Sequence, residues 1–216
     1  MGPAPVRPVF RFLVKGALHM NRRSFALTAS LAALLLPVLA APAAAASDHP
    51  AVQFTRQLAD ELIRAQMVGT VPRFTTVIRR HADIPGISMY TLGDYRSRLP
   101  KGKTDQYYKG ITAYIAHYFA NQTRKYRVLQ ADITDAAKGD GDQVVVNSLA
   151  TLEDGNKYRV QFMLRPDGNS WKVVDVKVGV PVLGFVSLTY GMRGDVQRFL
   201  AKKGGDVNAL IAALNR

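Results

Sequence analysis

The sequence predicts an α+β domain in which helices pack on one face of a curved antiparallel sheet. Helical periodicity comes first along the chain, alternating segments separated by turn residues follow, and helical segments end it. Consecutive hairpins give an antiparallel meander with one apolar face. Helices that come before and after such a meander cover that face, which is the arrangement of the α+β class.

An export signal is expected before the domain. Translation is expected to start at Met20, where Arg22-Arg23 is followed by an apolar run over residues 25–41 and by Ala44-Ala45-Ala46, an A-x-A cleavage pattern. This order is typical of a cleaved secretory signal, with a retained membrane anchor as the alternative. Residues 1–46 are therefore assigned to an N-terminal extension and signal peptide.

The arginine pair leaves two export routes open. Arg22-Arg23 followed by Ser24-Phe25 resembles a twin-arginine signal, although Asn21 stands where Ser or Thr is usual. The Sec route is the other possibility. Either route takes residues 47–216 out of the cytoplasm.

Residues 47–216 are predicted to form one basic domain. The full chain has a formal charge of +13, and residues 1–46 contain five of its 29 Lys and Arg and none of its 16 Asp and Glu, which leaves +8. A moderate positive excess favours attraction to anionic surfaces such as lipid headgroups, or serves solubility alone. The chain has no cysteine, which excludes disulfides, thiol catalysis and thiolate metal sites.

Three helical segments are expected before residue 100. Residues 51–68 carry apolar side chains at helical spacing, and residues 70–81 start a second helix with a cap residue and an early proline. Residues 84–86 (Ile-Pro-Gly) are expected to break the chain. Residues 87–95 then form a short helical piece.

The strongest helical pattern begins at Thr104. Its apolar side chains recur every three or four residues and are mostly aromatic. A tyrosine combines an apolar ring with a polar tip, so this stripe suits either a core helix or the wall of a cavity. The stripe consists of Tyr107, Tyr108, Ile111, Tyr114, Ile115, Tyr118 and Phe119.

Alternating segments separated by turns follow this helix. The candidate strands cover residues 128–134, 144–151, 158–165 and 171–178. On the last strand, Val174, Val176 and Val178 are predicted to share one face, while Val173 and Asp175 lie on the other. The end of the chain is helical again, with Asp206 as the cap of a last helix.

No constellation of catalytic or metal-binding residues is predicted. His49, His81 and His117 lie far apart, without a partner at metal-ligand spacing. Asp175 is the only carboxylate worth testing as a general base in a cavity, and pairing or backbone hydrogen bonding is the alternative for it. Neither a cofactor nor a nucleic-acid partner is expected, because no binding motif accompanies the basic residues.

Several segments together resemble the MlaC family, also called the toluene-tolerance family, over about residues 52–215. They are LGDYR at 92–96, the aromatic helix at 107–119, WKVVDV at 171–176 and GGDVNALIAAL at 204–214. The family's passage from strand to last helices is lengthened in this chain by Val180-Pro181-Val182-Leu183. That departure indicates a divergent branch, such as relatives that carry hopanoid or sterol-like lipids.

The resemblance implies a fold similar to nuclear transport factor 2, a cone of sheet and helices. It also implies a monomeric periplasmic carrier that is not an enzyme. Such a carrier holds a phospholipid by its acyl chains and passes it between an outer-membrane lipoprotein complex and an inner-membrane ABC transporter complex. An enzyme using Asp175 and an interaction module without a ligand remain the alternatives.

The acyl chains would occupy an apolar slot between the aromatic helix and the sheet. A slot and an ordinary core share one composition, so each residue suits both. The walls are predicted from Tyr108, Ile111, Ile115 and Phe119 on the helix and from Val160, Phe162, Leu164, Val174, Val176 and Val178 on the sheet. The mouth is predicted from Phe74, Ile78, Ile84, Leu92, Phe185 and Leu188.

Overall fold

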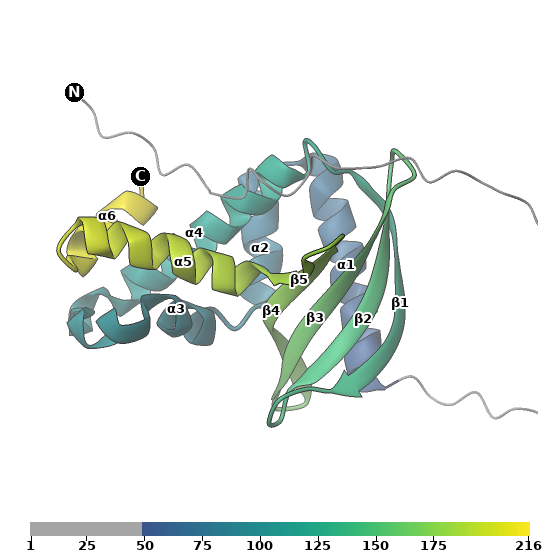
Figure 1. Ribbon diagram of the computed structural model, residues 1–216, viewed down its shortest axis with the longest axis horizontal. Helices are drawn as coiled ribbons and strands as arrows, with labels where there is room; N and C mark the ends of the chain where they lie inside the picture. The colour runs from purple at the N-terminus through teal and green to yellow at the C-terminus, as the bar shows by residue number, and fades with distance from the viewer. Residues whose placement is uncertain (1–48) are drawn as a thin grey trace, which may run out of the picture. The chain divides into compact units, whose positions relative to one another are not determined.

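The computed structural model describes residues 49–216, which contain six α-helices and one five-stranded antiparallel sheet (Figure 1). Every one of these elements lies within one compact unit that begins at Asp48. The predicted signal peptide, residues 1–46, lies outside the described residues. The described residues confirm the predicted α+β class, with helices on one face of a curved sheet.

The helices before the sheet follow the predicted pattern with one correction. They are α1 (Pro50–Val68), α2 (Val71–His81), α3 (Ile84–Leu92) and α4 (Thr104–Gln122), with 3₁₀ turns at Gly93–Arg98 and Lys101–Lys103. The expected break at residues 84–86 is wrong, because α3 begins there. The Asp83 carboxylate accepts a hydrogen bond from the Gly86 amide at 3.1 Å, which caps the helix, and proline suits a first turn.

The sheet is a meander in which strand order follows chain order. The strands are β1 (Val128–Lys138), β2 (Val144–Leu152), β3 (Lys157–Asp167), β4 (Ser170–Val180) and β5 (Gly184–Ser187). The predicted hairpins are confirmed, and β5 is an additional strand that the sequence pattern did not predict. The chain ends with α5 (Leu188–Lys202) and α6 (Val207–Leu214), where Asp206 caps α6 as expected.

A β-bulge changes the predicted faces of β4. Phe162 lies opposite Val176 and Leu164 lies opposite Val173, so the ladder passes over Val174. The inward face therefore continues from Val176 to Val173, and the predicted placement of Val174 beside Val176 is wrong. Ala82 forms a bridge with Val173, and the Asp83 amide donates to the Val173 carbonyl at 2.9 Å, which ties the α2–α3 junction to the bulge.

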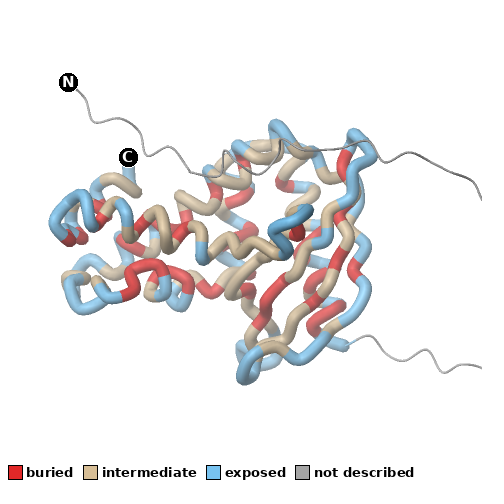
Figure 2. Tube along the Cα trace, in the orientation of Figure 1, coloured by how far each residue is buried: buried red, intermediate tan, exposed pale blue. Residues whose placement is uncertain are grey.

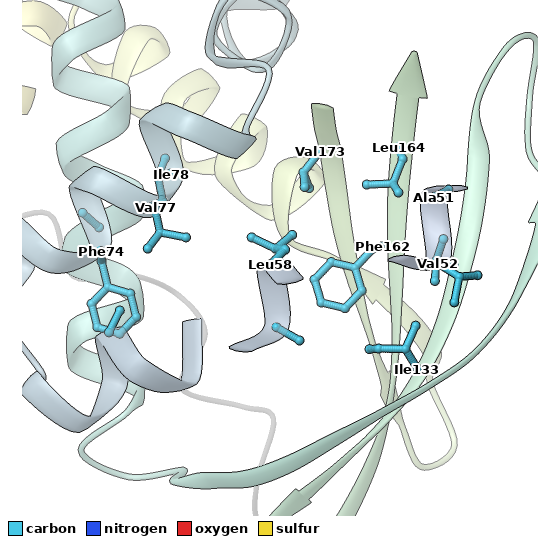
Figure 3. Packing of buried hydrophobic residues seen from close by; sticks show 14 of the residues in the cluster. Ala51, Val52, Leu58, Phe74, Val77, Ile78, Ile133, Phe162, Leu164 and Val173 are labelled. Carbon is cyan, nitrogen blue, oxygen red and sulfur yellow. The ribbon is translucent and has the colours of Figure 1, made fainter. Parts of the chain in front are cut away.

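Most of the buried apolar residues belong to two clusters, and Figure 2 shows where the buried residues lie along the chain. The sheet cluster joins α1, α2 and α4 to the inward face of the sheet, and Figure 3 shows part of it. The helical cluster joins α3, α4, α5 and α6. Helix α4 contributes to both, through Ala116 and Ala120 to the first and through Tyr107 and Ile111 to the second.

Burial on α4 differs from the predicted aromatic stripe. Tyr107 and Ile111 are fully buried as expected, but Ala116 and Ala120 are also buried, whereas Tyr114 and Tyr118 are only partly so. The small residues face neighbours that approach closely, because α4 packs on other elements along more than one side. The sequence pattern weighs large apolar residues and therefore overlooks these alanines.

Candidate functional site

An apolar cavity lies where the two clusters meet. Its volume is about 80 Å³, and its walls come from α1, α2, α3, α4, β3, β4 and α5. The lining residues are Leu58, Leu62, Val77, Ile78, His81, Ala82, Ile87, Ile115, Phe119, Phe162, Val173, Asp175, Val176, Leu188, Thr189 and Met192. Figure 3 shows Leu58, Val77, Ile78, Phe162 and Val173 gathered from α1, α2, β3 and β4.

The cavity brings together part of the predicted slot. Of the predicted residues, those on its wall are Ile78, Ile115, Phe119, Phe162, Val176 and Leu188. Phe74 and Leu164 lie deeper in the sheet cluster, Leu92 and Ile111 in the helical cluster, and Ile84, Tyr108 and Val160 pack against the clusters from outside. The structure places Val174, Val178 and Phe185 away from the cavity, and the Phe185 ring lies under the Arg159 guanidinium.

The sequence prediction missed most of the wall contributed by α1, α2 and α5. Leu58 and Leu62 belong to the apolar stripe of the first helix, so their periodicity marked them as buried without relating them to the cavity. Val173 was assigned to the wrong face because the bulge is not visible in the alternation. Met192 lies four residues before Val196 and eight before Leu200, so helical periodicity marks it as part of a buried stripe without relating it to the cavity.

His81 is one of the few polar groups on the cavity wall. Its Nε2 lies 3.2 Å from a carboxylate oxygen of Glu61, and the Phe54 ring meets the imidazole edge to face at 5.4 Å between centroids. Burial acts to raise the pKa of Glu61, but His81 and Arg80 outweigh it and hold that pKa below its ordinary value. The His81 imidazole thus already has a partner within the protein, the Glu61 carboxylate.

Asp175 also reaches the wall, and its carboxylate holds the start of α5. Its Oδ1 accepts hydrogen bonds from the Val176 amide at 2.8 Å and from the Thr189 amide at 3.0 Å. Thr189 lies in the first turn of α5, where backbone N–H groups lack helical partners and favour a negative charge. These contacts favour the hydrogen-bonded, structural interpretation of Asp175 over a role as a general base.

The LGDYR segment positions α3 against α5. Gly93 has φ +53° and ψ −123°, a conformation that essentially only glycine adopts. The Arg193 side chain donates to the Tyr90 carbonyl at 2.8 Å, and the Gln197 amide donates to the carbonyls of Thr91 and Leu92. The α5 residues of the cavity wall are therefore fixed by hydrogen bonds to the end of α3.

Within residues 49–216 no group of three His, Asp or Glu side chains is arranged to hold a metal ion. None of the described helices combines the length and the apolar character needed to cross a membrane. The arrangement that remains is an apolar cavity whose two titratable wall residues, His81 and Asp175, are both bonded to the protein itself.

Three comparisons with known proteins bear on this arrangement. A family model described as "MlaC protein" matches residues 54–216. A search among curated proteins found no match. Among solved structures, the chain is similar to a phospholipid-binding protein from Ralstonia solanacearum in complex with a phospholipid, with a TM-score of 0.61 and 17% identity over 78% of this chain and 96% of that chain.

A second solved structure has a smaller region in common with this chain. It is a DUF4783 family protein from Bacteroides ovatus, with a TM-score of 0.27 and 15% identity over 31% of this chain and 59% of that one. The similarity to the Ralstonia protein extends over nearly all of that protein, and it supports the fold described above.

Proposed function

This chain belongs to the MlaC family, and from that membership we propose that it is a periplasmic carrier that holds a phospholipid by its acyl chains. The observation that carries the proposal is the apolar cavity between the two clusters. Acyl chains need a dry apolar slot, and burying one methylene group contributes about 0.8 kcal/mol. A lipid can therefore be held without a specific polar contact to its headgroup.

The cavity must widen to hold a lipid. Its volume of about 80 Å³ is below the roughly 300–1,000 Å³ that ligand pockets commonly have. The sheet cluster and the helical cluster meet at the cavity, and α4 is common to both. Movement of α5 and α3 away from β4 and α2 would enlarge the cavity. Such a movement would leave most of each cluster buried.

The cavity wall favours a carrier over an enzyme. The Asp175 Oδ1 atom already accepts two backbone hydrogen bonds, and His81 is paired with Glu61. A general base has to reach a substrate proton at hydrogen-bond distance. We infer that the domain binds and releases its ligand without changing it and needs no cofactor.

Transfer of lipid between membranes follows from the same family membership. We infer that the protein acts as a monomer between an inner-membrane ABC transporter complex and an outer-membrane lipoprotein complex. The solved Ralstonia protein with its bound phospholipid supports phospholipid as the ligand class. A hopanoid or sterol-like lipid is the second candidate, because Val180-Pro181-Val182-Leu183 lengthens the passage into α5.

Native mass spectrometry of residues 48–216 tests the proposal, since all the described elements lie in this unit. The domain would be secreted into a bacterial periplasm, purified, and its bound lipid extracted and identified. We expect about one lipid per chain. A folded domain that carries no lipid and takes up none from added phospholipid or hopanoid would contradict the carrier proposal and favour an interaction module.

Val176→Trp tests whether the cavity is the binding site. Val176 lies on the wall, so an indole would fill the space, and we expect at least a tenfold loss of bound lipid. Val145→Trp is the matched control, because Val145 pairs with Met163 on the opposite face of the sheet. Equal lipid content in both folded variants would place the ligand elsewhere.

A further inference from the structure

Most of the large apolar side chains that the described residues expose gather at one end of the sheet. Seven such residues are strongly exposed, and all but Tyr90 and Tyr190 belong to this group. The group consists of Met67, Val68, Leu129, Val182 and Leu183, and Val182 is completely exposed. Isolated exposed hydrophobics are normal on a protein surface, whereas a concentration at one end indicates a binding surface.

Strand register and one side-chain contact place this group at one end of the sheet, with Met67, Val68 and Leu129 at the β1 edge and Val182 and Leu183 at the β5 edge. Val128 at the start of β1 lies opposite Leu152 at the end of β2, and Val160 near the start of β3 lies opposite Val178 near the end of β4. Because the end of β2 pairs with the start of β3, β1 begins at the end of the sheet where β4 finishes. The Gln66 side chain bonds to both the amide and the carbonyl of Val128, at 3.0 and 2.9 Å. The C-terminus of α1, the start of β1 and the β4–β5 turn thus occur at one end of the sheet.

Exposed cations lie in the segments before β1 and at the start of β3, at the same end of the sheet. They are Arg124, Lys125, Arg127, Lys157 and Arg159, against the exposed acids Glu153 and Asp154. Glu153 already pairs with Arg127 at 3.4 Å. This apolar–basic end, defined by the five apolar residues and five cations named here, therefore carries a net positive charge.

The β4–β5 turn is the most unusual part of the apolar–basic end. Its residues 181–184 are all exposed (Figure 2). Val182 has φ +69°, which is a rare conformation for a β-branched residue. The turn therefore leaves the apolar side chains of Val182 and Leu183 exposed.

The chemistry of this end fits an anionic membrane surface better than a protein partner. Protein interfaces concentrate aromatic side chains and exclude charge at their centre. Here exposed aliphatic side chains and exposed Lys and Arg share one end of the sheet, which suits the boundary between acyl chains and anionic headgroups. We propose that the apolar–basic end docks on anionic bilayers, with Val182 and Leu183 inserted between headgroups and the cations bound to lipid phosphates.

A single fluorescent label tests the insertion directly. Because the chain has no cysteine, Leu183→Cys in residues 48–216 accepts one environment-sensitive dye, and Lys101→Cys provides an exposed control at the Lys101–Lys103 turn, before α4. We expect vesicles of phosphatidylglycerol and phosphatidylethanolamine to shift the emission of the dye at position 183 to the blue and leave position 101 unchanged. Equal responses at both positions, or no response at position 183, would overturn the proposal.

Vesicle co-sedimentation tests the contribution of the cations. Arg124→Glu with Lys125→Glu reverses two charges at the apolar–basic end, while Lys101→Glu with Lys103→Glu makes the same change elsewhere. Every Lys or Arg near an anionic surface adds favourable binding free energy. We therefore expect Arg124→Glu with Lys125→Glu to weaken partitioning of the protein onto the vesicles by at least about tenfold. Equal weakening by both pairs would instead reveal attraction by total charge and would contradict a defined docking end.

Val182→Gly separates the apolar contribution from the charge. Glycine tolerates the positive φ of this position, so the substitution removes the apolar side chain without adding backbone strain. We expect weaker vesicle binding and an unchanged midpoint of thermal unfolding. Docking at the apolar–basic end does not require the cavity. We therefore expect Val176→Trp to lose its carried lipid and still bind vesicles. Loss of both properties in Val176→Trp would contradict this independence.

Discussion

Asp83 holds three elements together at one residue. Its carboxylate caps α3 through Gly86, accepts a hydrogen bond from Arg165 Nε on β3 at 2.7 Å, and its amide donates to Val173 on β4. Burial acts to raise the pKa of Asp83, but the bonds from Arg165 and Gly86 outweigh it and leave the pKa below its ordinary value. The charged form therefore stabilises the folded protein.

Asp83→Asn should reduce stability in a manner that depends on pH. Asparagine keeps a capping oxygen but loses the charge, so we expect a loss of about 1 kcal/mol at pH 7, allowing for the partial exposure of Arg165. A lowered pKa contributes stability that is present above the unfolded value of about 3.9 and disappears as pH falls through the folded value. Urea unfolding at pH 7 and pH 3 should show the difference shrinking in acid.

Asp140→Asn is the control for this measurement, because Asp140 is exposed in the β1–β2 turn. Its effect should stay within about 0.5 kcal/mol at both pH values. A difference between wild type and Asp83→Asn that is the same at pH 7 and pH 3 would show that the charge is not responsible.

Individual positions show where sequence patterns stop being informative. The alternation in β4 predicted that Val174 shares a face with Val176, but the bulge at Val174 places Val173 there instead. The bulged strand pairs at Val173 with Ala82, beside Asp83, and both residues are distant from β4 in the sequence. Ala116 and Ala120 are buried because of what approaches them, and alanine carries little hydrophobic signal of its own. Both errors arise from contacts that no local window contains.

At the scale of elements, the junction of α3 and α5 depends on Gly93. A Cβ atom there would lie 2.7 Å from Arg193 Nη2 and 2.8 Å from Gln197 Nε2, and the backbone conformation itself is strained for any other residue. Gly93→Ala should therefore cost about 1–3 kcal/mol. Thermal unfolding would measure this loss.

Gly102→Ala is the matched control for Gly93→Ala. An added Cβ at Gly102 meets no atom within 4 Å, and its backbone is not in the left-handed region. We expect a change within about 0.5 kcal/mol. If the two substitutions had equal effects, the junction would not depend on the conformation of Gly93.

Most elements could be predicted because their end signals are local. Asp206 caps α6 and Gly69 ends α1 in a left-handed conformation, and both signals are visible in a few residues. Strand β5 was missed because the Pro181–Gly184 turn lacks the Asn-Gly or Asp-Gly pair that usually marks a two-residue hairpin. The turn is recognised only from its pairing with β4.

At the scale of the whole molecule, two clusters share one boundary, and the cavity lies on it. Sequence periodicity identifies which faces of helices are apolar, but it does not say which faces meet incompletely. Ile115 and Phe119 were therefore predicted for the slot together with Ile111, which belongs to the closed interior of the helical cluster. A cavity is a property of packing between distant segments.

Removal of bound lipid should destabilise the whole protein if the proposed function is correct. A ligand at one hundred times its Kd contributes about 2.7 kcal/mol, and each kcal/mol shifts Tm by about 2–4 °C at this size, so delipidation should lower Tm by about 5–10 °C. Hydrogen exchange should increase most in residues 188–192 and 77–82, two segments that contribute side chains to the cavity wall. Uniform acceleration across β1 and β2 would indicate general loosening instead.

The sequential order of the strands has a consequence for how the chain folds. Each pairing from β1 to β5 joins neighbours along the chain through a short turn, so the sheet closes only small loops and loses little chain entropy as it forms. The contact between Asp83 and Arg165 spans 82 residues and closes a much larger loop. We therefore expect the meander to form early and the attachment of the α2–α3 junction to limit the folding rate.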